Sequence, residues 1–480
     1  MLFNSYIFLF AYLPVVWAGF FVLGRRSPPV AAAWLAVASV VFYGWWNWAF
    51  VPLLLVSAAF NYGMGLVIVR SDQARRGIVL GLGVGVNLAL LGYFKYAGFL
   101  VGNADALFGT TWTIPDIVLP IGISFFTFTQ IAFLVDCRRG LAREVHAVHY
   151  LLFVSYFPHL IAGPVIHHAD LMPQFALREI YRPQWENVAR GLTLLSLGLF
   201  KKCIIADSLA GTADATFAAA AAGAPVGGLA AWGGALAYTF QIYFDFSGYS
   251  DMALGLSWMF GIRLPVNFNS PYQAVGVIDF WRRWHMTLSR FLRDYLYIPL
   301  GGNRRGSMRR HLNLLITMVL GGLWHGANWT FVAWGALHGL YLGINHFWHW
   351  LLPALGIRRS FGWPGRLCAQ ALTFAAVVVA WVFFRAADMD AALRVLRGMA
   401  GWNGAGVSPG TVPAAIILVA AVIAFLLPNA NRIVGICGPL PRWRILVWQI
   451  SPAWAAFGAG ALVAALMAMQ RPSAFLYFNF

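Results

Sequence analysis

The feature that most constrains this chain is a series of long apolar runs that few charges interrupt. Residues 311–357 contain no Lys, Arg, Asp or Glu. About 20 apolar residues are enough for one helix to cross the hydrocarbon core of a bilayer, so this run alone predicts two crossings and a turn. Hydrophobic residues make up 60% of the chain and charged residues only 10%, a composition far more apolar than that of soluble domains. The sequence therefore predicts a multi-pass membrane protein.

Apolar segments recur along the whole chain and predict an all-α fold of about ten to twelve transmembrane helices. The expected spans cover residues 3–23, 30–46, 51–69, 77–94, 117–135, 188–206, 229–262, 312–328, 329–350, 367–384, 411–428 and 450–469. A polar loop is expected over 101–116 and a polar connector over 167–187. Pro and Gly interrupt the apolar stretch 156–165, which predicts a broken or re-entrant segment. Because no repeat or soluble domain is visible, we expect one integral membrane domain over 1–480, with a core at 1–400 and C-terminal spans and tail at 401–480.

The charge of the chain fits a membrane protein better than a nucleic-acid-binding protein. The net charge is +17, and basic residues gather in short loops after the first, third and fifth expected spans, as in cytoplasmic loops of membrane proteins. We therefore expect membrane lipid as a partner and no nucleic acid. The four Cys occur singly, without the His and Cys spacing of a zinc site or a disulfide framework, so no metal is expected.

Two acidic residues enter an apolar span in the stretch FDFSGYSDMALG, residues 244–255. Asp245 and Asp251 flank Ser247 and Gly248, and their spacing does not place them on one face of a straight helix. We therefore expect a helix broken at Ser-Gly. The two carboxylates would either cap the broken ends or line a polar passage.

A basic segment, residues 279–302, carries a histidine. Taken as one helix, it places Trp281 and His285 on an apolar stripe and Arg282, Ser289 and Arg293 on another. Residues 282–310 contain eight Arg against one acid, the i, i+4 partner of Arg290. Such a helix is typical of the membrane interface. Two interpretations stay open: an anchor for lipid headgroups, or a cluster in which Arg282, Arg283 and Arg290 steer an anionic donor such as coenzyme A.

A second histidine lies in GGLWHGANW, residues 321–329. Glycines beside His325 allow another backbone or a ligand to come close, and the neighbouring tryptophans exclude water. A helix–helix contact is one interpretation. The other is general-base work on a hydroxyl, for which imidazole is suited, in a dry site that protects a thioester from hydrolysis. No GxSxG elbow, HExxH or P-loop motif is present.

The two histidine motifs, WHMTLSRFLRDYLYIPLGGNR and LGGLWHGANWTFVAWGALHG, resemble those of the membrane-bound O-acyltransferase family. LPIGISFFTFTQIAFLVD, YFPHLIAGPV and FDFSGYSDMALG support the resemblance. It is most similar to the branch that contains the membrane subunit of alginate O-acetylation and the D-alanyl transfer protein of teichoic acid. The resemblance covers roughly residues 1–400 and the last six residues. It departs at Arg290, where the family often has an aromatic residue.

The resemblance implies a ring of helices with re-entrant segments around a tunnel through the bacterial inner membrane. It implies His325 as general base or positioner of the acyl acceptor, and His285 as a residue that orients the donor or the same hydroxyl. Acetyl-CoA would be the donor, with no bound cofactor. A periplasmic acetyltransferase partner and a polysaccharide such as alginate would receive the acetyl group.

The C-terminal FLYFNF resembles a tail in related acylation systems and makes Tyr477 a candidate acyl carrier. A phenol has a pKa near 10, so it would need a base. Two rival functions remain open: a transporter or flippase that does no covalent chemistry, with Asp245 and Asp251 along its path, and a scaffold without chemistry of its own.

Overall fold

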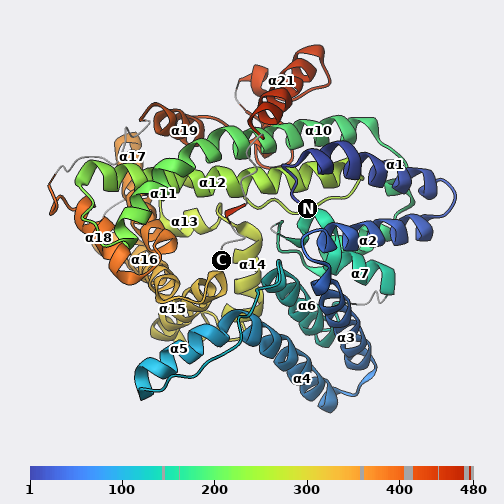
Figure 1. Ribbon diagram of the computed structural model, residues 1–480, viewed down its shortest axis with the longest axis horizontal. Helices are drawn as coiled ribbons and strands as arrows, with labels where there is room; N and C mark the ends of the chain where they lie inside the picture. Colours follow the sequence, from blue (N-terminus) through green and yellow to red (C-terminus); the bar gives the residue numbers. More distant parts are fainter. Residues whose placement is uncertain are drawn as a thin grey trace. The chain divides into compact units, whose positions relative to one another are not determined.

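The computed structural model is built from helices throughout the residues that it describes, which are 1–142, 146–161, 163–356, 362–404, 414–441, 443–469 and 475–476 (Figure 1). The all-α prediction is confirmed for these residues. The chain divides into two compact units, and α12 (Gly228–Met259) contributes residues to both. Whether the chain is one membrane domain stays a prediction.

The first unit comprises Met1–Leu199, Tyr249–Val266 and the C-terminal segment from Gln449. Its helices, with short 3-10 and π segments written η, are η1 (Phe8–Tyr12), α1 (Leu13–Gly24), α2 (Pro28–Gly44), η2 (Trp48–Phe50), α3 (Val51–Arg70), α4 (Gln73–Leu91), η3 (Gly92–Tyr96), α5 (Ala97–Phe108), α6 (Ile123–Arg138), α7 (Ala147–Ser155), α8 (Phe157–Leu160), α9 (His168–Leu171), η4 (Met172–Ala176), η5 (Arg178–Tyr181), α10 (Trp185–Phe200) and α21 (Pro452–Ala468).

Two predicted boundaries in this unit are wrong. The expected loop at 101–116 is helical as far as Phe108, because α4, η3 and α5 run on as one helical stretch. The expected span 117–135 begins late, at Ile123. Pro115 and Pro120 disfavour helix in the residues before them, and Gly122 takes a left-handed φ of 72° before α6 starts. The predicted break near 156–165 is observed, since α7 ends at Ser155 and α8 is a single short turn.

Three helical stretches are long and apolar enough to cross a membrane by length and composition, among the described residues: Trp48–Arg70, Gln73–Phe108 and Gly362–Arg385. Four shorter apolar helices accompany them: Phe8–Gly24, Pro28–Gly44, Ala414–Leu426 and Pro452–Ala468. The expected ten to twelve crossings, the ring of helices and the re-entrant segment stay predictions.

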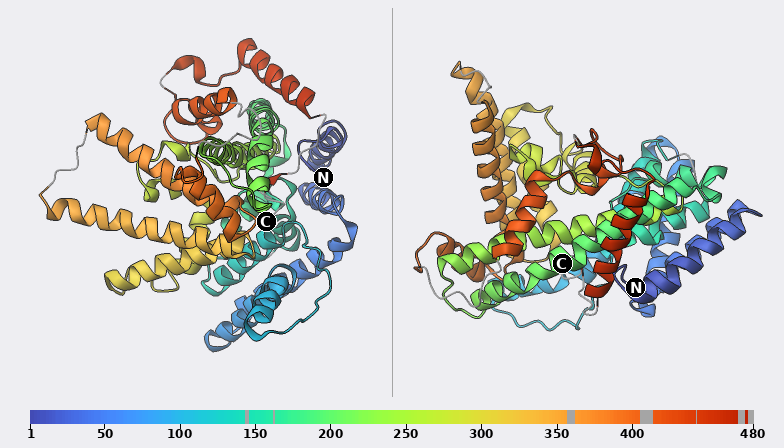
Figure 2. Two further views of the ribbon diagram at one scale, coloured as in Figure 1. Left: turned by 60° about the vertical axis from the view of Figure 1, so that its left-hand side comes forward. Right: turned by 90° about the horizontal axis from the view of Figure 1, so that it is seen from above.

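The second unit comprises mainly Phe200–Gly248 and Asn267–Trp448. Its helices are η6 (Lys201–Ala206), α11 (Asp207–Ala221), η7 (Pro271–Gln273), α13 (Val277–Trp281), α14 (Met286–Leu292), η8 (Arg293–Tyr297), α15 (Gly306–His325), α16 (Trp329–Ala354), α17 (Gly362–Arg385), α18 (Met389–Met399), α19 (Ala414–Leu426), α20 (Ala430–Ile433) and η9 (Arg444–Leu446). The helices α15 and α16 lie side by side as a hairpin, and α17 continues beside α16 (Figure 2).

The expected break of the helix at Ser247-Gly248 is wrong. The helix α12 is continuous over its 32 residues. A glycine inside a helix weakens it by only about 1 kcal/mol, and no proline removes a backbone donor here. Almost every residue between Tyr238 and Met259 is buried, so packing on all sides holds the helix. Asp245 and Asp251 therefore do not cap broken helix ends.

The expected single helix over residues 279–302 is also wrong. α13 ends at Trp281 and α14 begins at Met286, with His285 between them. Backbone groups of this corner bond to another segment instead of to their own helix: Asn269 N donates to Arg283 O at 2.9 Å, and Met286 N donates to Asn267 O at 3.0 Å. These tertiary hydrogen bonds compete with the helical i to i−4 bonds, which periodicity alone cannot reveal.

Candidate functional site

The α15–α16 hairpin places His325 at the last position of α15. Glycines make this tight turn feasible. A Cβ on Gly322 would lie 2.2 Å from the backbone oxygen of Phe331, and one on Gly326 would lie 2.0 Å from the Phe331 ring. Asn328 then starts α16, because its side chain accepts a hydrogen bond from Thr330 N at 3.1 Å. The glycines of GGLWHGANW therefore allow two helices to meet directly at the histidine.

Aromatic rings surround His325, which is only 4% exposed. The ring centroids of Trp324, Trp334 and Phe384 lie 4.8, 5.2 and 5.1 Å from that of the imidazole, all in edge-on geometry. Aromatic side chains of this kind bury large areas and exclude water. Trp324 shields His325 as expected, whereas Trp329, the other tryptophan of the motif, is 55% exposed and the second shielding indole is that of Trp334.

His285 occupies the corner between α13 and α14 with left-handed backbone angles, φ 42° and ψ 53°. Ser270 is the other non-glycine residue with a positive φ in the described part of the chain. This conformation costs an L residue roughly 1–2 kcal/mol, and such strain clusters at functional sites. The side chain is fully buried, with its Nδ1 2.9 Å from Asn267 Oδ1 and its ring 4.7 Å from that of Phe246.

The structure brings the two predicted histidines into one aromatic enclosure, which we define as Trp281, His285, Trp324, His325, Trp334, His338 and Phe384. The indole of Trp324 contacts both, with ring centroids 4.8 Å from His325 and 6.4 Å from His285. Two residues distant in the sequence thus meet around one side chain. Their catalytic roles stay predictions.

The sequence did not single out His338, a third histidine of the enclosure. It is fully buried on α16, one helical turn after Trp334, whose ring centroid is 4.8 Å away. The indole nitrogen of Trp281 donates to His338 Nδ1 at 3.3 Å, which connects α13 to α16. The i, i+4 spacing of Trp334 and His338 within a charge-free run was the signal available in the sequence.

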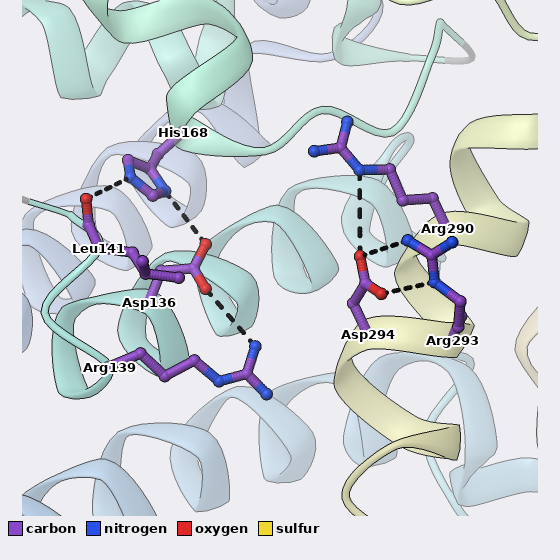
Figure 3. A network of polar contacts seen from close by, with 7 residues as sticks. All are labelled: Asp136, Arg139, Leu141, His168, Arg290, Arg293 and Asp294. Atoms are coloured by element: carbon purple, nitrogen blue, oxygen red, sulfur yellow. Dashed lines mark hydrogen bonds and ion pairs between the residues drawn. The ribbon is translucent and has the colours of Figure 1, made fainter. Parts of the chain in front are cut away.

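An open pocket of about 520 Å³ lies beside the enclosure and shares Trp281 with it. Its polar lining includes Arg282, Arg290, Arg293 and Ser289, and its other walls are mostly apolar. Asp294 pairs with Arg293 at 2.7 Å and with Arg290 at 4.0 Å (Figure 3). Within the part of the chain that the structure describes, no carboxylate forms an ion pair with Arg282. The N–H donors of a guanidinium group match the geometry of phosphate oxygens. This pocket therefore suits an anionic ligand with an apolar portion.

Two of the three predicted donor-steering arginines, Arg282 and Arg290, line this pocket together with Arg293. Arg283 does not line it. Its Nε donates to Asp279 Oδ1 at 2.9 Å instead, one helical turn away. The predicted stripe of Arg282, Ser289 and Arg293 faces the pocket even though these residues do not belong to one helix.

Both acidic residues of α12, Asp245 and Asp251, are buried. Asp245 Oδ1 forms an ion pair with Lys202 Nζ at 2.6 Å, and the same ammonium lies 2.9 Å from Asp207 Oδ1. Lys202 and Asp245 are 3% and 1% exposed, so this is a buried ion cluster. Tyr477 lies outside the described residues, so its role as acyl carrier stays a prediction.

A further polar cluster of the first unit was not predicted. Asp136 lies 3.1 Å from His168 Nδ1 and 3.8 Å from Arg139, and His168 Nε2 lies 3.3 Å from Leu141 O (Figure 3). These contacts connect α6 to α9. They hold the C-terminal end of α6 and the turn that follows it against His168 of α9.

Comparison with known proteins identifies the family. Residues 124–362 match the model of MBOAT, the membrane-bound O-acyltransferase family. A peptidoglycan O-acetyltransferase of Helicobacter pylori is 42% identical over 432 residues, which cover 84% of this chain and 80% of the relative. The "Probable alginate O-acetylase AlgI" of Pseudomonas aeruginosa is 45% identical over 410 residues, 83% of this chain and 75% of the relative.

A teichoic acid D-alanyltransferase of Streptococcus thermophilus is similar over a shorter region. It is 28% identical over 236 residues, 48% of this chain and 57% of the relative. The long matches at more than 40% identity and the family model agree with the helical, strongly apolar chain described above. The chain is a membrane protein and an O-acyltransferase, and it belongs to the membrane-bound O-acyltransferase family.

Proposed function

We propose that this chain takes an acetyl group from a cytoplasmic thioester donor, acetyl-CoA, and delivers it across a bacterial inner membrane for O-acetylation of a polysaccharide. The observation that carries the proposal is the aromatic enclosure, in which His285 and His325 contact the same indole beside an arginine-lined pocket. Relatives named for O-acetylation of alginate and of peptidoglycan support the acetyl group and the class of acceptor.

The donor binds in the pocket of about 520 Å³ lined by Arg282, Arg290 and Arg293. Coenzyme A carries several phosphate charges at one end and its thioester at the other. Guanidinium groups form charge-assisted hydrogen bonds with phosphate. Trp281 and Met286 line the pocket, and Met286 directly follows His285. A donor held by its phosphates can therefore extend its thioester toward the enclosure.

The transfer itself needs one base and a dry site. The hydroxyl oxygen of the acceptor attacks the thioester carbonyl, its proton passes to an imidazole, and the sulfur leaves and takes up that proton as the thiol. We assign His325 to positioning and deprotonating the acceptor. The rings around it keep out water that would otherwise hydrolyse the thioester. The first acceptor is either the Tyr477 phenol or a serine of a periplasmic partner protein, which then esterifies a polysaccharide such as alginate.

The test is transfer of label from acetyl-CoA by purified protein in lipid. The parent should label protein, peptide acceptor or polysaccharide, and His325→Ala should lower the rate by about 1,000-fold, the range of general acid–base catalysis. His349→Ala, an exposed histidine near the far end of α16, is the matched control and should stay at the parental rate. A correctly inserted His325→Ala protein with parental activity would exclude this mechanism.

The same assay tests the donor pocket and the carrier. Arg282→Ala should raise the KM for acetyl-CoA by about tenfold, which is the loss of one charge-assisted hydrogen bond, and leave kcat nearly unchanged. Arg309→Ala, an exposed arginine outside the pocket, is its control.

Tyr477→Phe should abolish protein-bound label if the phenol is the carrier. Alginate and peptidoglycan fragments offered side by side identify the polymer class.

A transporter that moves an intermediate without covalent chemistry is the rival function. It was based on Asp245 and Asp251 in an apolar span and on broken helical segments; α12 is continuous between the two carboxylates, while the break near 156–165 is present. Label that becomes covalently attached to protein or polymer excludes transport alone.

A further inference from the structure

We propose that Asn267 fixes the tautomer of His285 and thereby assigns this imidazole to the hydroxyl of the acyl acceptor, not to the carbonyl of the donor. The inference rests on the proposed function and deepens it, because either role was compatible with the position of His285. It follows from three hydrogen bonds that converge on one amide oxygen.

The orientation of the Asn267 amide comes from the backbone of the next helix. Thr287 N lies 3.5 Å from Asn267 Oδ1, and Thr287 Oγ1 lies 2.9 Å from the same atom. A backbone N–H only donates, and an amide NH₂ group cannot accept its proton. The atom that faces α14 is therefore the amide oxygen, and the alternative orientation of the amide would set two donors against each other.

The amide orientation determines which nitrogen of His285 carries the proton. His285 Nδ1 lies 2.9 Å from the same Asn267 Oδ1. An amide oxygen only accepts, so Nδ1 must donate its N–H. In the neutral imidazole, the proton on Nδ1 leaves the lone pair on Nε2.

The main chain of Asn267 reinforces this arrangement. Its carbonyl oxygen accepts from Met286 N at 3.0 Å, so main chain and side chain of Asn267 hold His285 and both residues that follow it. The strained φ of 42° at His285 is fixed by these bonds. Asn267, which lies before α13, thus determines both the position of the His285 ring and the nitrogen that carries its proton.

The tautomer decides what His285 recognises. A nitrogen with a lone pair accepts a hydrogen bond from a hydroxyl. It repels a thioester carbonyl oxygen, which is also an acceptor. His285 in this tautomer therefore accepts a hydrogen bond from the O–H of the acyl acceptor as the acceptor binds in the aromatic enclosure, and the hydroxyl turns to His325 when its proton is transferred. Asn267 is a positioning residue, since it acts on the acceptor through His285.

Solid-state NMR on protein in lipid, labelled with nitrogen-15 histidine, tests the tautomer directly. The chain has 11 His, so the His285 resonances are taken from the difference between the parent and His285→Asn. A protonated Nδ1 and a bare Nε2 would confirm the inference. A bare Nδ1, or a ring protonated at both nitrogens near neutral pH, would overturn it.

Kinetics test the assignment to the acceptor. Asn267→Leu removes the amide oxygen and should lower kcat by about 100-fold, the effect of misplacing a catalytic group, while the dissociation constant of acetyl-CoA stays within about threefold. Asn267→Asp keeps an acceptor oxygen and should restore most of kcat. His349→Ala, an exposed histidine outside the enclosure, is the control and should stay within about threefold of the parent.

The outcomes separate this inference from the proposed function. If the parent transfers no label from acetyl-CoA, or if His325→Ala retains parental activity, the proposed function fails. If only His285→Ala retains parental activity, the inference fails and the proposed function stands. If His285→Ala is inactive while Asn267→Leu keeps parental kcat, or if Asn267→Leu weakens acetyl-CoA binding by as much as it lowers kcat, only the inference about Asn267 fails.

Discussion

Substitution of Gly322 by alanine tests whether the close contact of α15 and α16 sets the position of His325. An added Cβ would lie 2.2 Å from Phe331 O and 3.1 Å from its carbonyl carbon, whereas ordinary contact begins at 3.4 Å. The obstacle is backbone, so no side-chain rotation relieves it. The two helices must separate locally by about 1 Å, and overpacking of this kind typically costs about 1–3 kcal/mol. His325 lies less than one helical turn further along α15 and must move with it.

The expected result is a folded protein with a much lower rate of transfer. A misplacement of about 1 Å lowers catalysis by roughly 100-fold, and we expect this fall in kcat for Gly322→Ala. Part of the packing cost is offset because alanine favours a helix by about 1 kcal/mol over glycine. The assay is acetyl transfer from labelled acetyl-CoA, with the thermal midpoint of the purified protein measured in parallel.

Gly343→Ala on α16 is the matched control. Its added Cβ would meet His311 Nδ1 at 3.9 Å, an ordinary distance, so activity should stay parental and stability should rise slightly. If Gly322→Ala had the activity and thermal midpoint of Gly343→Ala, the reasoning that the glycine contact positions His325 would be refuted.

Three further predictions concern stability, measured as thermal or denaturant unfolding of protein in detergent. Lys202→Met leaves Asp245 buried without its ammonium and should destabilise by about 3 kcal/mol, while Lys202→Met with Asp245→Leu should recover most of this. If the double variant were as unstable as Lys202→Met alone, the unpaired Asp245 carboxylate would not be the cause of the destabilisation. Asn61 and Asn87 join α3 to α4 through reciprocal amide bonds of 3.1 and 2.6 Å, so Asn87→Leu should cost about 1 kcal/mol, and a value near zero would contradict this. Asn328→Ala removes the cap of α16 and should cost about 1 kcal/mol, whereas Asn328→Asp, which keeps a capping oxygen, should lose less.

The helical segments were largely predictable because apolar runs and basic loops report directly on helices in a membrane. The α15–α16 hairpin was expected at 312–328 and 329–350 and is found with its turn between His325 and Trp329. Its glycines were expected to allow close approach, and they do. These features depend on local composition, which can be read directly from the sequence.

The failures share a physical cause, since they arise where tertiary contacts override local preference. Ser247 and Gly248 favour a break in isolation, yet burial on all sides keeps α12 continuous. The helical periodicity over 279–302 predicted a single helix. The backbone of Arg283 and Met286 instead forms hydrogen bonds with the segment at Asn267 and Asn269. Nothing in the sequence pairs these two segments. His285 was expected on an apolar stripe and is buried, while its local conformation was missed.

That conformation explains why a histidine in the corner serves the proposed chemistry better than one on a helix. On a helix, His285 would share the regular path of its neighbours, and the ring would be oriented only by packing. In the corner, Asn267 holds its Nδ1 at 2.9 Å, Trp324 contacts both His285 and His325, and Met286 lines the arginine pocket. Under the proposed function, a donor in that pocket and an acceptor hydroxyl in the enclosure approach this corner from different directions. The strain at the corner, roughly 1–2 kcal/mol, is small beside the several kcal/mol that oriented reactants remove from a barrier.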